Sequence, residues 1–361
     1  MAQIKKAILT GGGRATRLRP ITTTINKHLI PLAGKPMIFH AIEKAVEAGV
    51  EEIFINTNPG ETQIQEVVGD GSRWGVTITC FEQTGGPQGI AHVVKCAEKF
   101  IGDDPFMFYL SDNIVLGSLA PLFKTFDEEN LDCMLALSKV PDPERFGVPE
   151  FDSKGILVDI IEKPKNPPSD FAVTGIYLYN SNFFKAFSQI AKSDRGEYEI
   201  SSIHSYFLKN NYKVGYREIT GWWKDTGKPN DLIAANRLLF EEMPDKDFKL
   251  ECACLADTKY SGKIGIEKNT VIGKNVVING PVLVGDTCYL ENCTLGAYTT
   301  IGSNSIVKNM SIENSIVFSD SRLEANVHIT DSIIGKEAKV LAHPENTPHR
   351  LIIGDQTFVE L

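Results

Sequence analysis

Glycines and arginines stand together near the start of the chain, in the stretch 11–20 (GGGRATRLRP). Gly11, Gly12 and Gly13 let backbone N–H groups come close to a phosphate, and arginine offers a planar set of donors to phosphate oxygens. The stretch has neither the G-K-[ST] of a P-loop nor the spacing of a dinucleotide site. It indicates phosphate binding of another kind, with a tight turn carrying solvated arginines as the plain alternative.

Two aspartates each follow an apolar run. Asp112 comes after 106–110 (FMFYL), and Asp225 comes after 221–224 (GWWK). A hard cation that bridges phosphates is usually held by one or two carboxylates together with substrate oxygens. The pair is therefore a candidate Mg²⁺ site, although an aspartate after a strand also serves as a turn former or a helix cap.

Alternating elements in the first part of the chain would position these groups. Apolar runs at 6–10, 53–55 and 106–110 predict buried strands, and the apolar spacing after Pro36 is helical. Strand, helix and strand in this order predict right-handed βαβ units, hence an α/β fold with a Rossmann-like, mostly parallel sheet. Ligands bind such sheets outside the carboxyl ends of the strands, where the glycine loop and Asp112 both fall.

Beyond about residue 250 the pattern changes, and aliphatic residues recur every six positions. One series is Ile266, Ile272, Ile278, Val284 and Leu290; after a one-residue slip, Leu295, Ile301 and Val307 follow, and then Leu323, Ile329, Ile334 and Val340. A six-residue period places one inward aliphatic on each face of a triangular coil, which predicts a left-handed parallel β-helix. We expect a first domain at 1–245 and the β-helix domain at 246–361.

The composition excludes several classes of protein. The formal charge of −9 argues against a nucleic-acid surface, which needs a broad cationic footprint. No run of about 18 apolar residues exists, and the N-terminal apolar stretch is short, so we expect neither a membrane span nor export. The seven cysteines form no metal-site pattern, which favours reduced structural thiols in a cytoplasmic protein.

The glycine stretch resembles the signature of one family. Residues 12–22 (GGRATRLRPIT), 26–31 (NKHLIP) and 35–38 (KPMI) are similar to the motifs of nucleotidyltransferases that activate sugar 1-phosphates. This chain has Ala15 where that family commonly has glycine, and Asn26 where it has proline. Alanine is expected to be tolerated if its φ is negative, and Asn26 leaves the lysine of the motif, Lys27, intact.

Later blocks extend the resemblance in the same order. They are Gln83 with 89–92 (GIAH), 110–113 (LSDN), 146–148 (FGV), 162–164 (EKP), 173–177 (VTGIY), 195–200 (RGEYEI) and 222–229 (WWKDTGKP). The β-helix and the ending 351–355 (LIIGD) resemble, more narrowly, the long form of glucose-1-phosphate thymidylyltransferases. The first domain would then be the catalytic one.

The resemblance implies an enzyme in which a sugar 1-phosphate attacks the α-phosphorus of a nucleoside triphosphate in line and pyrophosphate leaves, with Mg²⁺ as cofactor. Positioning and electrostatics supply most of such catalysis, and no protein nucleophile is needed. The resemblance assigns catalysis to Arg17, Lys27 and Lys163; nucleotide binding to Gly11, Gly12, Gly13, Arg17, Gln83 and Gly89; sugar-phosphate binding to Asp112, Gly147, Glu162, Lys163, Thr174, Tyr177 and Arg195; and metal binding to Asp112 and Asp225. Arg14 and Arg19 stay open between phosphate contact and surface charge.

The substrates implied are dTTP and glucose 1-phosphate, giving dTDP-glucose. Gln83 offers both an amide donor and a carbonyl acceptor, which suits the imide edge of thymine or uracil. The alternatives are a UTP-using enzyme for glucose or N-acetylglucosamine 1-phosphate, a second acetyltransferase activity that binds acetyl-CoA on the β-helix, and a non-catalytic sensor of nucleotide sugars. Candidate bases for the acetyltransferase are His328, His343 and His349. The flat faces of stacked coils predict a homo-oligomer.

Overall fold

The computed structural model describes residues 3–13, 15–252, 258–341, 348–349, 351–353 and 358–360. Arg14, Cys254, His343 and the end of the 351–355 block lie outside the described residues. Packing divides the chain into unit 1, Met1–Gly13 with Ile38–Lys224, and unit 2, Arg14–Met37 with Asp225–Leu361. The predicted domain boundary between residues 245 and 246 splits the chain once, whereas each packing unit combines two segments of the chain. The boundary stays a prediction.

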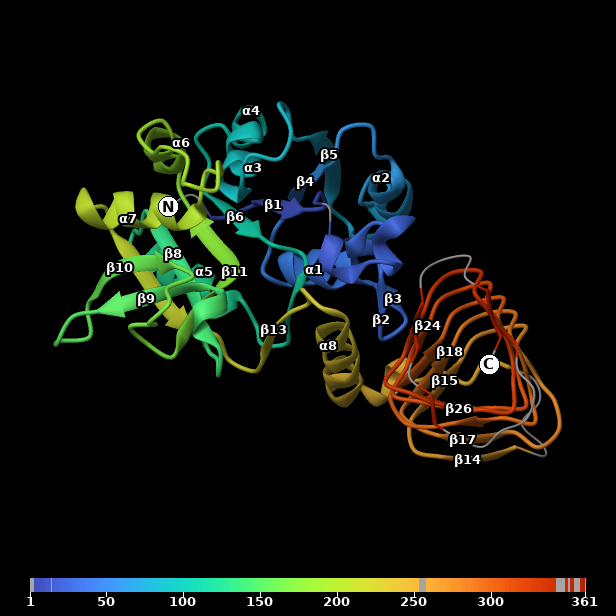
Figure 1. The fold of residues 1–361 in the computed structure, drawn as a ribbon. Helices are drawn as coiled ribbons and strands as arrows, with labels where there is room; N and C mark the ends of the chain where they lie inside the picture. Colours follow the sequence, from blue (N-terminus) through green and yellow to red (C-terminus); the bar gives the residue numbers. More distant parts are fainter. Residues whose placement is uncertain are drawn as a thin grey trace. The chain divides into compact units, whose positions relative to one another are not determined.

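A seven-stranded sheet forms the centre of unit 1, in the order β12-β8-β11-β6-β1-β4-β5 (Figure 1). β1 runs parallel to β4 and β6, β5 parallel to β4, and β12 parallel to β8, whereas β11 is antiparallel to both of its neighbours. The predicted α/β fold with a mostly parallel, Rossmann-like sheet is confirmed. The strands of unit 1 are β1 (Lys6–Thr10), β4 (Glu52–Thr57), β5 (Thr77–Glu82), β6 (Phe106–Tyr109), β7 (Asn113–Val115), β8 (Cys133–Lys139), β9 (Gly147–Phe151), β10 (Leu157–Glu162), β11 (Phe171–Tyr179) and β12 (Val214–Glu218), with β13 (Trp223–Asp225) at its end.

Both faces of this sheet are buried. Ile8, Phe106 and Phe108 pack in one apolar cluster with side chains of α3, α4, α6 and α7. Ala7 and Leu9 point to the opposite face by alternation and are also fully buried. The helices are α1 (Met37–Glu47), α2 (Gln63–Val68), α3 (Ile90–Cys96), α4 (Glu98–Ile101), α5 (Ala120–Glu128), α6 (Asn182–Phe187) and α7 (Ile200–Lys209). Within the described residues, no helix has the length and apolarity to cross a bilayer.

Unit 2 is dominated by three six-stranded parallel sheets, whose strands follow one another around a triangular coil (orange to red in Figure 1). This is the predicted left-handed β-helix. Its strands are β14 (Lys259–Ser261), β15 (Ile264–Ile266), β16 (Val271–Ile272), β17 (Val277–Asn279), β18 (Val282–Val284), β19 (Tyr289–Glu291), β20 (Thr294–Leu295), β21 (Thr299–Ile301), β22 (Ile306–Lys308), β23 (Ser311–Glu313), β24 (Ile316–Val317), β25 (Arg322–Glu324), β26 (His328–Thr330), β27 (Ile333–Ile334), β28 (Lys339–Leu341), β29 (Pro348–His349), β30 (Ile352–Ile353) and β31 (Phe358–Glu360). Unit 2 also contains β2 (Pro31–Leu32), β3 (Lys35–Pro36), α8 (Pro229–Glu242) and short 3₁₀ turns.

The six-residue series lines the inside of the coil. Its members are buried, except that Ile272 is only half-buried near the first coil. The one-residue slip has a structural cause, because the coils shorten: Lys259 lies opposite Val277, eighteen positions on, whereas Thr294 lies opposite Ser311, seventeen positions on. Each shorter coil omits a residue at a corner and keeps the inward position in register.

The cysteines within the described residues are free thiols: Cys80, Cys96, Cys133, Cys252, Cys288 and Cys293. Burial raises the pKa of Cys288 to about 11 and that of Cys293 to about 12. A thiol is nucleophilic and binds metals as the thiolate, so these two are unreactive at neutral pH. They fit the predicted structural role.

Candidate active site

The glycine loop follows β1 and lies against the end of β4. Gly11 N–H donates to Asn56 Oδ1 at 3.2 Å, and Gly13 N–H donates to Asn58 Oδ1 at 2.9 Å. A Cβ atom at Gly11 would lie 2.7 Å from the Asn56 carbonyl oxygen, and Gly13 has a φ of +116°, so glycine is required at both positions. Two N–H groups of the loop therefore hold its shape, and Gly12 lies between them.

Asp112 lies beside the glycine loop at the carboxyl edge of the sheet. Thr10 ends β1 and Ser111 follows β6; Ser111 N–H donates to Thr10 Oγ1 at 3.0 Å, and Ser111 Oγ donates to the Thr10 carbonyl. Asp112 is half-buried, and its Oδ1 accepts from Asn113 Nδ2 at 2.8 Å. Asn113 Oδ1 in turn accepts from Trp223 Nε1 at 2.8 Å. The loop and Asp112 thus stand at neighbouring strand ends, as the fold predicts.

Glu162 is the centre of a charged cluster at the end of β10. Its Oε1 lies 3.1 Å from Lys163 Nζ and 3.5 Å from Arg195 Nη2, and the same Nη2 lies 2.9 Å from Glu199 Oε1. Burial opposes the positive charge of Arg195, but Glu199 and Glu162 together raise its pKa. Gly147 pairs with Glu162 across β9 and β10. Four predicted sugar-phosphate residues are therefore together, with two cations held in place by carboxylates.

Lys163 adopts a left-handed backbone conformation, with a φ of +47°. This conformation is uncommon for a residue that carries a Cβ. Lys163 N–H donates to the Phe146 carbonyl at 2.9 Å, and the Phe146 ring packs edge-on against Trp223 with centroids 5.1 Å apart. The neighbouring packing keeps the strained lysine in position beside Glu162.

Thr174 and Tyr177 lie in β11, where the register with β8 shifts. Thr174 is fully buried, and its hydroxyl donates to the Ala136 carbonyl at 2.9 Å. Tyr177 belongs to the apolar cluster, where burial and then the charge of Glu162 raise its pKa. Both residues stabilise the strand behind the charged cluster, and their contact with sugar hydroxyls stays a prediction.

Gln83 and Gly89 are brought together at the end of β5. Gln83 N–H donates to the Thr57 carbonyl at 3.3 Å, and its side-chain Nε2 donates to the Gly89 carbonyl at 3.4 Å. A Cβ atom at Gly89 would lie 2.5 Å from the Tyr198 carbonyl oxygen, and φ is +96°, so glycine is required there as well. The predicted base-reading pair lies on the unit that carries the glycine loop.

In unit 2, Arg17 and Asp225 converge near Gly227. A Cβ atom at Gly227 would lie 3.0 Å from Asp225 Oδ2 and 3.7 Å from Arg17 Nη1. Lys27 begins the 3₁₀ turn Lys27–Leu29, and Asn26 caps that turn by accepting from His28 N–H at 2.8 Å. Asn26 thus orders the turn that presents Lys27.

Ala15 departs from the expectation for its position. We expected alanine to be tolerated there if its φ were negative, but the φ of Ala15 is +41°. A left-handed conformation costs alanine about 1 kcal/mol relative to glycine. Thr22 Oγ1 donates to the Ala15 carbonyl at 2.8 Å, which helps to hold the strained residue.

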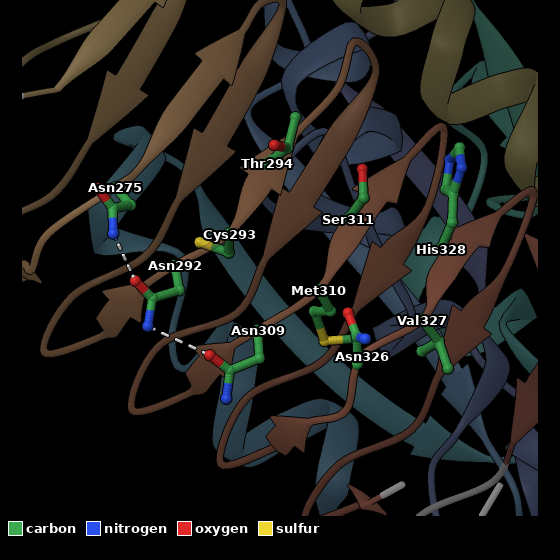
Figure 2. A pocket seen from close by; sticks show the side chains of 10 residues that line it. All are labelled: Asn275, Asn292, Cys293, Thr294, Asn309, Met310, Ser311, Asn326, Val327 and His328. Atoms are coloured by element: carbon green, nitrogen blue, oxygen red, sulfur yellow. Dashed lines mark hydrogen bonds between the residues drawn. The ribbon is translucent and has the colours of Figure 1, made fainter. Parts of the chain in front are cut away.

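A separate pocket of about 540 Å³ lies on the outer face of the β-helix (Figure 2). Asn275, Asn292 and Asn309 stand on successive coils along its side, joined by side-chain hydrogen bonds of 2.9 and 3.2 Å. His328 lines the pocket, and its Nε2 lies 3.4 Å from Glu313 Oε1. This is the position of one candidate base of the acetyltransferase alternative.

The sequence-based site set omits Asn56 and Asn58, which shape the glycine loop. Both follow the buried strand 53–55, so the rule that polar groups gather at the carboxyl ends of parallel strands points to them. It also omits Glu199, which holds Arg195, although that residue lies within the quoted block 195–200. No group of three or more metal-binding side chains occurs within the described residues.

Known proteins are similar to this chain over nearly its whole length. The nucleotidyl transferase family matches residues 6–242. The low-salt glycan biosynthesis nucleotidyltransferase Agl11 of Haloferax volcanii is 37% identical over 99% of this chain and 100% of its own length. A glucose-1-phosphate thymidylyltransferase of Streptomyces griseus is 33% identical over 99% of both chains.

Solved structures show the same likeness. A Bacillus anthracis chain described as a glucose-1-phosphate thymidylyltransferase, in complex with a sucrose, is 38% identical with a TM-score of 0.61, over 64% of this chain and 94% of its own. A UDP-glucose pyrophosphorylase complexed with UDP-glucose has a TM-score of 0.58 at 23% identity, over 66% of this chain and 100% of its own, which is a likeness of fold alone.

Proposed function

The chain belongs to the nucleotidyl transferase family and acts on sugar phosphates, and from this premise we propose that it transfers a nucleotidyl group from dTTP to glucose 1-phosphate, giving dTDP-glucose and pyrophosphate. The observation that carries the proposal is the charged cluster at Glu162. Lys163 and Arg195 lie 3.1 and 3.5 Å from one carboxylate, so two cations are positioned for a phosphate before any substrate arrives. Such preorganisation avoids the cost of arranging charges during the reaction.

The reaction joins two polyanions, so the enzyme must offset their repulsion. In the proposed arrangement Lys163 and Arg195 bind the phosphate of the sugar, and Arg17 and Lys27 bind the triphosphate. A phosphate oxygen of the sugar 1-phosphate attacks the α-phosphorus, and the bond to pyrophosphate breaks. No side chain needs to become covalently attached, because orientation and fixed positive charge supply the rate enhancement. Gly147 and Glu162 face the sugar, with Thr174 and Tyr177 behind them.

Asp112 and Asp225 are the residues that would hold Mg²⁺. Both offer carboxylate oxygens, the donors that this hard cation prefers, and magnesium commonly takes its remaining ligands from water and substrate phosphates. When bound, Mg²⁺ supplies positive charge to the phosphate oxygens.

A second candidate uses UTP in place of dTTP. Gln83 is the observation that favours it, because the imide edge that an amide reads is common to thymine and uracil. The thymine methyl group adds only about 1 kcal/mol of apolar burial, so dTTP is preferred on the likeness to thymidylyltransferases.

A screen of pyrophosphate release tests both candidates. ATP, GTP, CTP, UTP and dTTP are each combined with glucose 1-phosphate and with N-acetylglucosamine 1-phosphate. Each combination is measured with and without Mg²⁺. We expect the highest kcat/KM with dTTP and glucose 1-phosphate. Lys163→Ala is expected to lose a hundredfold or more in rate, on the order seen for a preorganised donor, whereas Lys165→Ala removes an exposed charge two positions away and keeps the rate. A strong preference for UTP overturns dTTP, and no pyrophosphate from any pair overturns the function.

A further inference from the structure

The amide group of Gln83 has a defined orientation. Its Nε2 lies 3.4 Å from the Gly89 carbonyl and 3.1 Å from His92 Nδ1. A carbonyl oxygen can only accept, so the atom facing Gly89 must be the amide nitrogen, and both N–H groups of the amide are used by the protein. Within the part of the chain that the structure describes, Gln83 Oε1 has no hydrogen-bond partner. The amide therefore offers an incoming base an acceptor and no donor.

His92 lies on α3, and its ring is held by its neighbours. The ring stacks on Tyr198 with centroids 6.2 Å apart and an interplanar angle of 20°, and Phe187 packs against it at 6.3 Å. Cys96 Sγ lies 3.8 Å from Nδ1, one helical turn further on. Since Nε2 of Gln83 donates, Nδ1 of His92 must accept, which requires a neutral ring with its proton on Nε2.

The surroundings of His92 favour this neutral form. Burial, and then the ammonium of Lys192, lower its pKa. The titratable and charged groups that face the ring are Lys192, Tyr198 and Cys96. No carboxylate is among these neighbours to favour the imidazolium.

We propose that His92 is a positioning residue for base selection: by accepting from Gln83 it turns the amide oxygen toward the base, so that the site reads an imide N–H. The inference rests on the proposed function, because it takes Gln83 to face the base. Thymine and uracil carry that N–H at ring position 3, where cytosine carries a lone pair that a carbonyl oxygen repels. The amide donor that the sequence suggested for base reading is committed to His92 and Gly89.

Protonation of His92 changes this arrangement. The imidazolium carries a proton on Nδ1 and can no longer accept, so the Gln83 amide loses one of its two hydrogen bonds and its orientation is no longer fixed. An amide that can rotate is able to direct an N–H toward the base, which suits the lone pair of cytosine. Selection against cytosine should weaken as the pH falls through the pKa of His92, which lies below the usual value of about 6.5.

The experiment compares kcat/KM for dTTP with that for dCTP, at one fixed sugar 1-phosphate, in the full-length protein. His92→Phe keeps a ring against Tyr198 but has no acceptor, and we expect the dTTP/dCTP ratio to fall about tenfold, the value of one directed hydrogen bond. His92→Gln supplies a carbonyl acceptor and should bring the ratio back toward that of the native protein. Lys95→Ala removes a charge of the same helix that pairs with Glu98 and not with His92, and it is the matched control, with an unchanged ratio.

The pH dependence of the native protein provides a second measurement, which does not depend on the folding of a variant. The dTTP/dCTP ratio should fall as the pH is lowered below about 6.5, with the same trend in nucleotide binding measured by calorimetry. A ratio that is flat with pH, or equal in His92→Phe and the native protein, overturns the inference while leaving the proposed function in place. A native protein that uses no nucleoside triphosphate overturns the proposed function instead.

Discussion

Asn58 forms hydrogen bonds with both backbone groups of Gly13: Oδ1 accepts from its N–H at 2.9 Å, and Nδ2 donates to its carbonyl at 3.4 Å. Nδ2 also donates to Glu61 Oε2 at 2.7 Å, which fixes the plane of the amide. The shape of the glycine loop therefore depends on a side chain forty-five positions further along, at the end of the neighbouring strand.

Removal of this side chain should loosen the loop without removing any proposed substrate contact. We expect Asn58→Ala to lower kcat/KM for the nucleoside triphosphate about tenfold, because each backbone hydrogen bond contributes about 0.5–1.5 kcal/mol. Steady-state kinetics at saturating sugar 1-phosphate measures this. Asn210→Ala, which loses one local hydrogen bond at the end of α7, is the control. Equal kcat/KM in both variants and the native protein would contradict the role of Asn58.

Lys163 allows charge and backbone strain to be separated. Lys163→Gly removes the ammonium but relieves the left-handed conformation, so we expect a rate loss as large as in Lys163→Ala, with a free energy of unfolding about 0.5–1 kcal/mol higher than in Lys163→Ala. Urea unfolding compares the two variants. If the glycine variant were the less stable of the two, the strain at φ +47° would not be present in solution.

Metal dependence gives a third prediction. Chelation should abolish pyrophosphate release and added Mg²⁺ should restore it. Asp112→Asn and Asp225→Asn keep the shape of each side chain but lose its charge, so both should need a higher Mg²⁺ concentration for half-maximal rate, by about tenfold or more. The exposed Asp103→Asn is the control. Unshifted Mg²⁺ titrations in the two variants would rule out these aspartates as ligands.

His204 should make the stability of unit 1 depend on pH. It is fully buried, with Nε2 2.6 Å from Tyr179 Oη and with Nδ1 lacking a partner among the described residues. Burial lowers its pKa to about 3, so below about pH 6.5 only the unfolded chain takes up the proton. Stability that is present above pH 6.5 is then lost as the pH falls, by up to about 1.4 kcal/mol per pH unit.

Tryptophan fluorescence can follow this transition, because Trp74, Trp222 and Trp223, the three tryptophans of the chain, all belong to unit 1. The pH slope of the urea unfolding free energy should be smaller in His204→Phe than in the native protein. Parallel slopes would mean that other groups cause the acid sensitivity.

Asn236 should be a major source of stability within unit 2. It is 1% exposed on α8; Oδ1 accepts from Ala33 N–H at 2.8 Å, and Nδ2 donates to the Tyr298 carbonyl at 3.0 Å. Asn236→Ala leaves the Ala33 N–H and the Tyr298 carbonyl without this hydrogen-bond partner, at a cost of about 2–4 kcal/mol. Thermal unfolding followed by circular dichroism should show a lower Tm. Glu242→Ala, which removes an exposed side chain at the end of the same helix, should leave Tm nearly unchanged.

The β-helix could be predicted in detail because its signal is local. An inward position every six residues is a property of each coil by itself, so the series from Ile266 to Val340 identifies the coil without knowledge of distant contacts. The corners of the coil were harder to predict. Asn275, Asn292 and Asn309 adopt a positive φ there, and they recur once per coil, every seventeen residues. Asparagine tolerates this conformation, but it occurs in many other settings.

The candidate site could be predicted only in part. The fold places Gly11 and Asp112 at neighbouring strand ends, and that follows from the order of elements. The contacts of Asn58 with Gly13 and of Glu162 with Arg195 join segments far apart in the sequence. They depend on side-chain packing, for which the sequence has no periodic signal. The left-handed φ of Ala15 is equally invisible, because an alanine codes for no particular turn.

The regular pairing of coils has a consequence for how the length of unit 2 can change. Thr294 lies opposite Ser311 and Asn292 bonds Asn309, so positions seventeen apart are equivalent in both backbone and corner. Excision of residues 310–326, a stretch of seventeen that does not include Tyr298, would join Asn309 to Val327 and keep a corner of asparagine followed by a buried apolar residue. The solenoid is in this sense modular: whole turns can be gained or lost by recombination, and the remaining rungs need not be redesigned.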